Sequence, residues 1–275
     1  MAMSHNQIME RYRKSNHRPW EDSYGMVRLS PHTYYVGDNW VGVLLILTED
    51  GIVMIDSGIK GQMWLIFESV RKLGYDPEKD IKLCLLSHAH SDHCSGMALL
   101  KAYANPIIYM SEIEKDWVRD PLRYAVFSKD VDYVEPFEAD RFYEYGVLIE
   151  HGGFRFLPVH TPGHTPGTTS FFYEDSGYRV GFHGGMGMNT LLDSCFSCRE
   201  DALRERMIYR SNMEKLLDIP VDITVTNHAG NIKLSQRAGE DKMDFLPFVD
   251  YGFWKRHLRE KLDKLSQMEV ESVFK

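Results

Sequence analysis

The chain has 275 residues, of which 43% are hydrophobic and 26% charged, and its formal net charge is −8. These values are ordinary for a globular protein with a large core, and we interpret residues 1–275 as one domain, with 1–25 as an N-terminal extension and 251–275 as a C-terminal helix. The negative charge argues against a nucleic-acid substrate, because such binding relies on a basic surface. The longest apolar runs, such as Val41–Leu47, are far shorter than a bilayer span, so we expect no membrane association.

The N-terminal segment Met1–Trp20 is polar and lacks the apolar core of an export signal, which predicts a cytoplasmic protein. A chain from which an export signal had been removed would have the same appearance. Cys195 and Cys198 have the spacing of a redox pair or a metal clip, but no second Cys or His pair stands close to them. In a reducing compartment we favour free thiols over a disulfide.

Three elements are predicted in the first hundred residues. Gly61–Leu73 has apolar residues at helical spacing and ends at Gly74, as a helix does. Ile81–Leu86 is a short apolar run of the kind that forms a buried strand. Cys94–Tyr103 can be helical, so the residues between these last two segments lie where a strand gives way to a helix.

That junction carries four side chains that can bind a metal: His88, His90, Asp92 and His93. Neutral imidazole and carboxylate are suitable ligands for zinc and similar ions. In a loop, His88 and His90 can converge on one metal while Asp92 and His93 reach a second. A polar surface loop with incidental histidines is the alternative, although three of the chain's 12 histidines fall in this short window.

Two later histidines also follow strand-like segments. His164 is at the centre of the turn Thr161–Thr168, which two Pro-Gly pairs make rigid. His228 follows the apolar stretch Val221–Val225. Three protein ligands leave a metal one open position, which is typical of a catalytic zinc site. The sequence thus predicts two groups of ligands: His88, His90 and His164, and Asp92, His93 and His228.

Two more helices are predicted towards the C-terminus. Ala202–Leu217 stops before Pro220, and Tyr251–Met268 carries an apolar stripe. Core packing is the usual role of such a stripe, and a dimer contact is the alternative. The stripe consists of Phe253, Trp254, His257, Leu258, Lys261, Leu262 and Leu265.

The order His-x-His-x-Asp-His, then a Gly-His turn, then a late His resembles the metallo-β-lactamase superfamily, over most of the chain. His32–Gly37 and Gly51–Gly58 resemble the opening strands of that fold. The resemblance implies an α/β fold: a four-layer αββα sandwich of two mixed β-sheets flanked by helices. It also implies that Asp56, in the Asp-Ser-Gly turn, supports the metal ligands from beneath and is not itself a ligand.

Within the superfamily, Pro247–Asp250 and the helix after it resemble the third subclass of the metallo-β-lactamases, whose sites use only His and one Asp. Lactonases, glyoxalase-type thioesterases and tRNA-processing members carry an Asp that bridges both metals, and Gly185 stands where that Asp is expected. The absence of this Asp argues against the activities of those relatives. His183 lies nearby, as a supporting residue or, alternatively, an extra ligand.

The resemblance implies two zinc ions, with iron or manganese as alternatives, that activate water for attack on the carbonyl of a cyclic amide or ester. Asp92 would also be catalytic, because it can orient the nucleophile and pass a proton to the leaving group. We expect a small-molecule substrate. The candidate substrate-binding residues are Trp40, for which a core anchor is the alternative, and Asn189.

The segment Ser111–Glu150 is rich in aromatic and charged residues and is expected to cover the cleft, with Trp117, Tyr124, Phe127 and Tyr133. Other functions remain open: a lactonase or thioesterase, a phosphodiesterase of the same fold, or a metal-binding protein without catalysis. The sequence also leaves open whether the protein is a monomer or a homo-oligomer.

Overall fold

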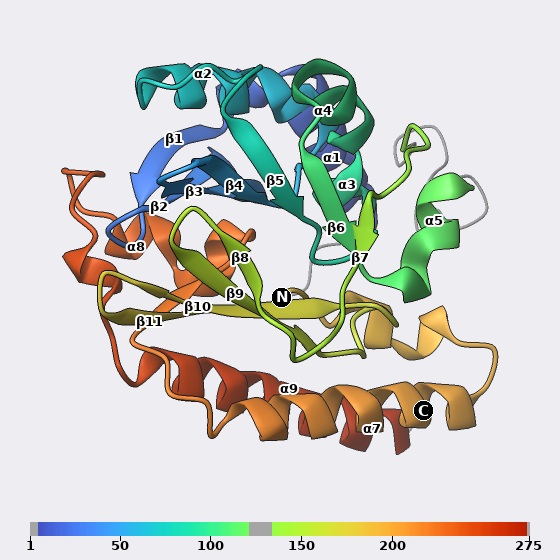
Figure 1. Cartoon of the computed structure of the whole chain (residues 1–275). Coiled ribbons are helices and arrows are strands. Elements are labelled where there is room, and N and C mark those ends of the chain that lie inside the picture. The colour runs from blue at the N-terminus through green and yellow to red at the C-terminus, as the bar shows by residue number, and fades with distance from the viewer. Residues whose placement is uncertain (1–4, 121–133, 274–275) are drawn as a thin grey trace.

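The computed structural model describes residues 5–120 and 134–273. Two β-sheets lie face to face, and helices cover the outer face of each (Figure 1). The predicted four-layer αββα arrangement is therefore confirmed. None of the helices in these two ranges combines the length and hydropathy that a membrane span requires.

The first sheet has seven strands that follow one another in chain order. Neighbours from β1 to β4 run antiparallel, and those from β4 to β7 run parallel. Its strands are β1 (Ser23–Arg28), β2 (Thr33–Asp38), β3 (Gly42–Thr48), β4 (Gly51–Ile55), β5 (Ile81–Leu85), β6 (Ile107–Met110) and β7 (Arg141–Phe142).

The second sheet has five strands in the order β12-β11-β10-β9-β8, and only β11 and β12 run parallel. Its strands are β8 (Ile149–His151), β9 (Phe154–His160), β10 (Thr169–Asp175), β11 (Tyr178–Phe182) and β12 (Ile223–Val225). The apolar stretch that begins at Val221 forms a strand from Ile223, where its pairing with Val180 of β11 begins.

Helices α1 to α5 lie on the side of the first sheet, and α7 and α9 cover the second (Figure 1). Their bounds are α1 (His5–His17), α2 (Met63–Lys72), α3 (Ser91–Cys94), α4 (Met97–Ala104), α5 (Lys115–Arg119), α7 (Arg199–Leu216), α8 (Leu234–Arg237) and α9 (Phe253–Val273). Short 3₁₀ turns connect them: η1 (Pro19–Glu21), η2 (Lys60–Gln62), η3 (Glu112–Glu114), η4 (Asn189–Leu191), η5 (Asp193–Cys195), η6 (Ala229–Ile232) and η7 (Leu246–Phe248).

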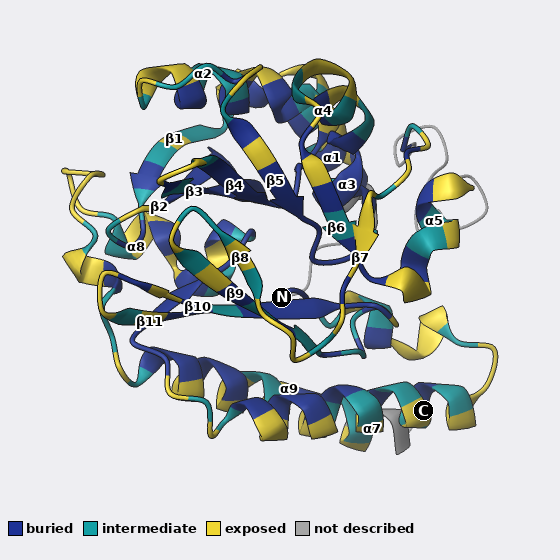
Figure 2. Ribbon diagram, viewed as in Figure 1, coloured by how far each residue is buried: buried dark blue, intermediate teal, exposed yellow. Residues whose placement is uncertain are grey.

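The core lies in three layers, one between the sheets and one beneath each set of helices (Figure 2). On β3, Leu44 and Ile46 face the other sheet while Val43 and Leu45 face the helices, as alternation along a strand requires. A strand buried on both faces is apolar throughout.

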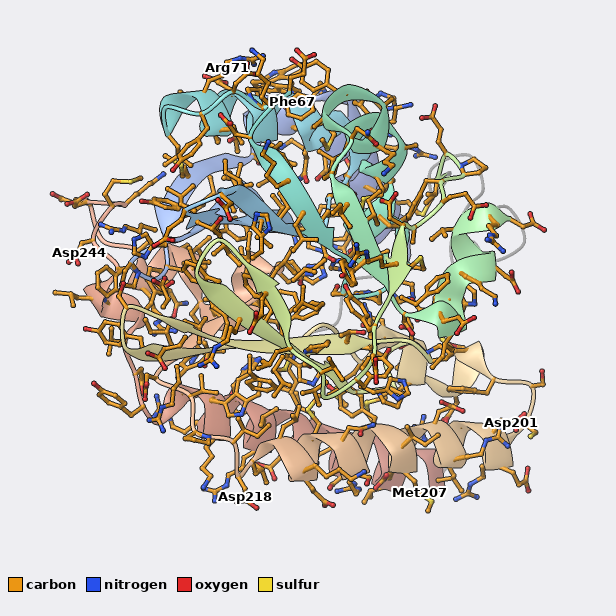
Figure 3. The ribbon with its side chains drawn as sticks, in the orientation of Figure 1. Phe67, Arg71, Asp201, Met207, Asp218 and Asp244 are labelled. Carbon is orange, nitrogen blue, oxygen red and sulfur yellow. The ribbon has the colours of Figure 1, made fainter. Side chains whose placement is uncertain are left out.

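The α9 stripe packs within the chain, so its core interpretation holds. Trp254 and Leu258 contact the α7 residues Tyr209 and Met213 in the layer beneath the second sheet. On the outer faces, side chains such as Arg71 on α2 and Met207 on α7 point away from the sheets (Figure 3).

Candidate metal centre

The structure brings together the two groups of residues that the sequence predicts. Group 1 is His88, His90 and His164, and group 2 is Asp92, His93 and His228; within each group the potential ligand atoms all lie within 4.8 Å of one another. Both groups lie at the ends of strands. Four of the residues follow β5: His88, His90, Asp92 and His93. His164 lies between β9 and β10, and His228 follows β12.

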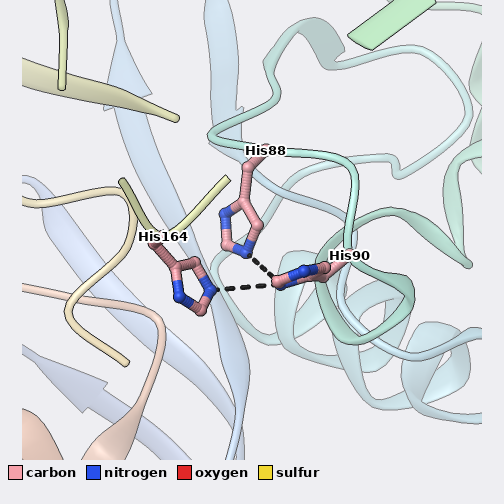
Figure 4. Close-up of side chains that lie close together, drawn as sticks. All are labelled: His88, His90 and His164. Carbon is pink, nitrogen blue, oxygen red and sulfur yellow. Dashed lines mark hydrogen bonds between the residues drawn. The ribbon is translucent and has the colours of Figure 1, made fainter. Parts of the chain in front are cut away.

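The spacing within group 1 fits a tetrahedral metal. Nδ1 of His90 lies 3.1 Å from Nε2 of His88 and 3.1 Å from Nε2 of His164 (Figure 4). Two nitrogens bound at the usual zinc distance in tetrahedral geometry are about 3.3 Å apart. The three nitrogen atoms therefore form a cradle of the right size for one zinc ion.

Group 2 has a similar shape with a mixed donor set. Oδ2 of Asp92 lies 3.5 Å from Nε2 of His93 and 3.4 Å from Nε2 of His228. One carboxylate and two imidazoles suit zinc, iron or manganese. The ring centroids of His88 and His93 are 4.1 Å apart, so the two groups are neighbours.

Hydrogen bonds to the outer ring nitrogens fix which nitrogen of each histidine faces the centre. His164 Nδ1 donates to the carbonyl of Gly187 at 2.9 Å, and His228 Nδ1 donates to the carbonyl of Trp40 at 3.1 Å. An imidazole that donates through Nδ1 presents the lone pair of Nε2, which a metal ligand needs.

Asp56 supports both groups from beneath. Its fully buried carboxylate accepts hydrogen bonds from Nδ1 of His93 at 3.0 Å, and from the backbone N–H and the hydroxyl of Ser87 at 2.7 and 2.8 Å. The Ser87 oxygen in turn lies 3.0 Å from Nδ1 of His88, and the Asn227 amide also donates to Asp56. The contacts support the role implied for Asp56.

Ser87 and Asn227 are functional residues that the sequence reasoning missed. Each directly precedes a predicted ligand, and that adjacency was the available signal. Glu114, whose carboxylate accepts the backbone N–H of Ala89 between His88 and His90, was also not predicted.

The buried setting keeps most of the imidazoles neutral. Burial, reinforced by the neighbouring histidines, lowers the pKa of His88 and His164 well below the ordinary value. Burial likewise lowers the pKa of His90 to about 4, and that of His228 below its ordinary value. Neutral imidazoles are ready to bind a metal without first losing a proton.

Charge pairing dominates inside group 2. Burial alone would lower the pKa of His93, but Asp92 and Asp56 together raise it above its ordinary value. Burial alone would raise the pKa of Asp92, but His93, His228 and His90 bring it below its ordinary value. Asp92 is therefore a carboxylate at neutral pH.

Two glycines, Gly185 and Gly187, pack closely against His164. A Cβ at Gly185 would lie 2.6 Å from Cβ of His164, and one at Gly187 would lie 3.1 Å from Cε1 of the same ring. The close approach leaves no room for a side chain at Gly185 unless His164 moves.

His183 does not join either group. Its Nδ1 accepts the N–H of Gly185 at 3.1 Å, and its ring lies 6.3 Å from that of Trp254 on α9. These contacts support a structural role on the α9 side of the second sheet, and the alternative of an extra ligand is not supported.

Trp40 borders group 2 and is also a packing residue. Its ring centroid is 6.1 Å from that of His228 and 6.1 Å from that of Tyr12 on α1, and the side chain is half-buried. Trp40 therefore packs against α1, as a core anchor does, and also lies beside a ligand of group 2, as a substrate-binding residue would.

A pocket of about 360 Å³ adjoins group 1. Trp117 lines it, with its ring 6.3 Å from that of His90, as predicted for this segment. Asn189 is exposed beside the pocket and does not line it, while its neighbour Thr190 does. Other lining residues are His164, Thr165, Phe196 and Arg204. Tyr124, Phe127 and Tyr133 lie outside the described residues.

The fold and the paired His/Asp groups define a metallo-hydrolase. Residues 39–179 match the metallo-beta-lactamase superfamily, and the chain belongs to this superfamily as one of its hydrolases. Among solved structures it is similar to BJP-1 of Bradyrhizobium japonicum, a subclass B3 metallo-beta-lactamase, with a TM-score of 0.79 and 22% identity over 93% of this chain and 97% of that one. At that identity the likeness shows the fold.

Two of the relatives that match the sequence are hydrolases by name. The chain is 24% identical to the probable metallo-hydrolase YqgX of Bacillus subtilis over 200 residues, which are 71% of this chain and 87% of YqgX. It is 26% identical over 144 residues to the hydroxyacylglutathione hydrolase GloC of Haemophilus influenzae, covering 50% of this chain and 65% of GloC.

Proposed function

We propose that the protein is a zinc-dependent hydrolase that opens a cyclic amide or ester, in the manner of a β-lactamase. The observation that carries this proposal is the pair of neighbouring three-ligand groups, since three protein ligands leave each metal an open position. The all-His-and-Asp ligand set and the glycine at position 185 favour this chemistry over that of relatives with a bridging Asp.

Zinc bound at both groups would lower the pKa of a water molecule to about 7 and polarise the substrate carbonyl. Asp92, whose carboxylate the surrounding histidines keep ionised, would be placed to accept a hydrogen bond from the attacking water and to pass a proton to the leaving group. Asp56 holds His93 and, through Ser87, His88, so that both groups keep their geometry.

The pocket beside His164 is the proposed place for the part of a small-molecule substrate that does not react. Trp117 and Phe196 offer apolar surface there, and Thr190 and Arg204 offer polar groups. The volume is in the range of small-molecule sites, although the lining is mainly polar and also includes Asp201 and Glu205. Arg204 is paired with Asp201 at 2.9 Å, so it is partly neutralised as a partner for a substrate carboxylate.

A thioesterase is the second candidate, because GloC is named as a hydroxyacylglutathione hydrolase. The glycine at position 185 argues against it, and the chain's net charge of −8 argues against a phosphodiesterase. We also propose a cytoplasmic location. All four cysteines are free thiols, including the exposed Cys195 and Cys198, which suits a reducing compartment.

Turnover of three substrates by one zinc-loaded sample tests the proposal: a chromogenic cephalosporin, an acyl-homoserine lactone and an acyl-glutathione thioester. We expect hydrolysis of the cephalosporin, abolished in His88→Ala and kept in His17→Ala, whose histidine is exposed on α1. Lactone turnover alone would favour a lactonase, against which the glycine at position 185 argues. Thioester turnover alone would favour the second candidate. Bound zinc without turnover of any of the three would support a metal-binding protein without catalysis.

A further inference from the structure

We propose that Glu114 is the positioning residue of group 1, joining the loop that carries His88 and His90 to the turn that carries His164. This inference rests on the proposed function, because it assumes that group 1 binds a metal. Glu114 ends η3, on the connection from β6 to α5, and is not itself a member of either group.

Each oxygen of the Glu114 carboxylate holds one of the two segments. Oε2 accepts the backbone N–H of Ala89 at 2.6 Å, and Ala89 is the residue between His88 and His90. Oε1 accepts the backbone N–H of Gly167 at 2.8 Å, three residues after His164. One side chain therefore links segments that lie 25 and 53 residues away from it in the sequence.

The burial of Glu114 is unusual for an acid and needs an explanation. Its side chain is only 1% exposed. A carboxylate is costly to bury unless hydrogen-bond donors replace its water. Here the donors are the two backbone N–H groups and the hydroxyl of Thr165, which neighbours His164. Glu112, two residues earlier, is an ordinary exposed acid paired with Lys115.

The fit around the carboxylate is close. A Cβ at Gly167 would lie 2.7 Å from Cγ of Glu114 and 2.8 Å from Oγ of Ser111, so the turn approaches Glu114 as closely as a glycine allows. The turn is also braced internally, because the N–H of Thr165 donates to Oγ1 of Thr168 at 3.0 Å. A shift of Glu114 would thus be passed to the whole His164 turn.

Glu114→Gln separates this role from simple space filling. The amide has nearly the same shape, but its NH₂ group would face one of the two backbone N–H donors, which then loses its acceptor. Group 1 should bind zinc less tightly, while the group 2 ligands Asp92 and His228 keep their contacts.

The experiment measures zinc affinity one group at a time, by competition with a chelator in the full chain. In a His228→Ala background, which leaves group 1, we expect Glu114→Gln to weaken binding about 10- to 100-fold, as loss of a residue that orients a ligand typically does. In a His164→Ala background, which leaves group 2, we expect no change. Glu112→Gln is the matched control and should leave both affinities as they are.

Cobalt absorption spectra supply a second readout, since the visible bands should change for group 1 only. Equal zinc affinity of group 1 with and without Glu114→Gln would overturn the inference while leaving the proposed function intact. Equal losses in both groups would also overturn it, because they would indicate a general loss of structure. If group 1 binds no zinc even when Glu114 and the three group 1 histidines are all present, the inference and the proposed function fail together. Glu114→Asp, which keeps the charge but cannot span both donors, serves if the glutamine variant does not fold.

Discussion

Asp56 Oδ2 accepts a hydrogen bond from Nδ1 of His93 at 3.0 Å, and both side chains are buried. Asp56 has a backbone φ of +65°, a conformation that Asn and Gly adopt more readily than other residues. With this backbone conformation the carboxylate meets Ser87 as well as His93. The residue therefore couples the stability of the fold to the geometry of the metal centre.

Asp56→Asn keeps the backbone conformation but removes the charge and one acceptor. We expect zinc at group 2 to bind about 10- to 100-fold less tightly. A buried donor without its acceptor should also lower the free energy of unfolding by about 1–3 kcal/mol. Chelator competition and urea unfolding measure the two effects. Unchanged affinity and stability would show that His93 does not need this partner.

Asp92→Asn tests the catalytic role of the carboxylate. The amide cannot accept a proton, so we expect kcat to fall about 10²- to 10⁴-fold. Zinc at group 1 should remain, because His88, His90 and His164 are unaffected. Steady-state kinetics and metal analysis of the same sample check this. A rise in KM with kcat unchanged would contradict the proposed role.

Gly185→Asp would place a carboxylate at the position where the sequence resemblance leads us to expect an Asp. A Cβ at this position would lie 2.6 Å from Cβ of His164. We therefore expect overpacking to lower the free energy of unfolding by about 1–3 kcal/mol, and group 1 to lose its zinc ion. Gly239→Ala is the control, since a Cβ at that position meets nothing within 4 Å. A stable variant with both metals bound would mean that His164 can move aside.

Two buried histidines, His183 after β11 and His257 on α9, predict a loss of stability in acid. Burial lowers the pKa of His183 and of His257 to about 3 each, with help from His257 for His183 and from Lys261 for His257, while an unfolded histidine titrates near 6.5. The unfolded chain then binds more protons, so stability is complete above about pH 6.5 and falls as the pH drops towards 3.

His257→Gln removes one of these two groups. The fall in unfolding free energy between pH 6 and 4 should be less steep than in the unchanged protein by about 1.4 kcal/mol per pH unit. Urea unfolding at several pH values measures it, and the comparison cancels the contribution of the metal ligands. If stability falls equally steeply with pH in both proteins, the low pKa of His257 is contradicted.

The ligand groups could be predicted from the sequence because their motifs are local. Four of the six residues lie in one short window, and the other two follow recognisable strands. The predicted helix Cys94–Tyr103 is divided between α3 and α4, because the N–H of Gly96 donates to the carbonyl of Gly58 on a neighbouring segment. No local pattern reveals such a contact.

Glu114 could not be predicted for the same reason. Its partners are backbone N–H groups, which every residue but proline carries, so no motif marks them. Asn189 and its neighbour Thr190 were both candidates for holding the substrate, and only Thr190 lines the pocket, while Asn189 is exposed.

The zinc content of three proteins tests the central claim most directly. Elemental analysis should give two zinc ions per chain in the unchanged protein, and one in each of His164→Ala and His228→Ala, because each variant disables one group. Circular dichroism of the same samples confirms that they are folded. A single zinc ion in the unchanged protein, or none, would contradict the account of two neighbouring metal sites.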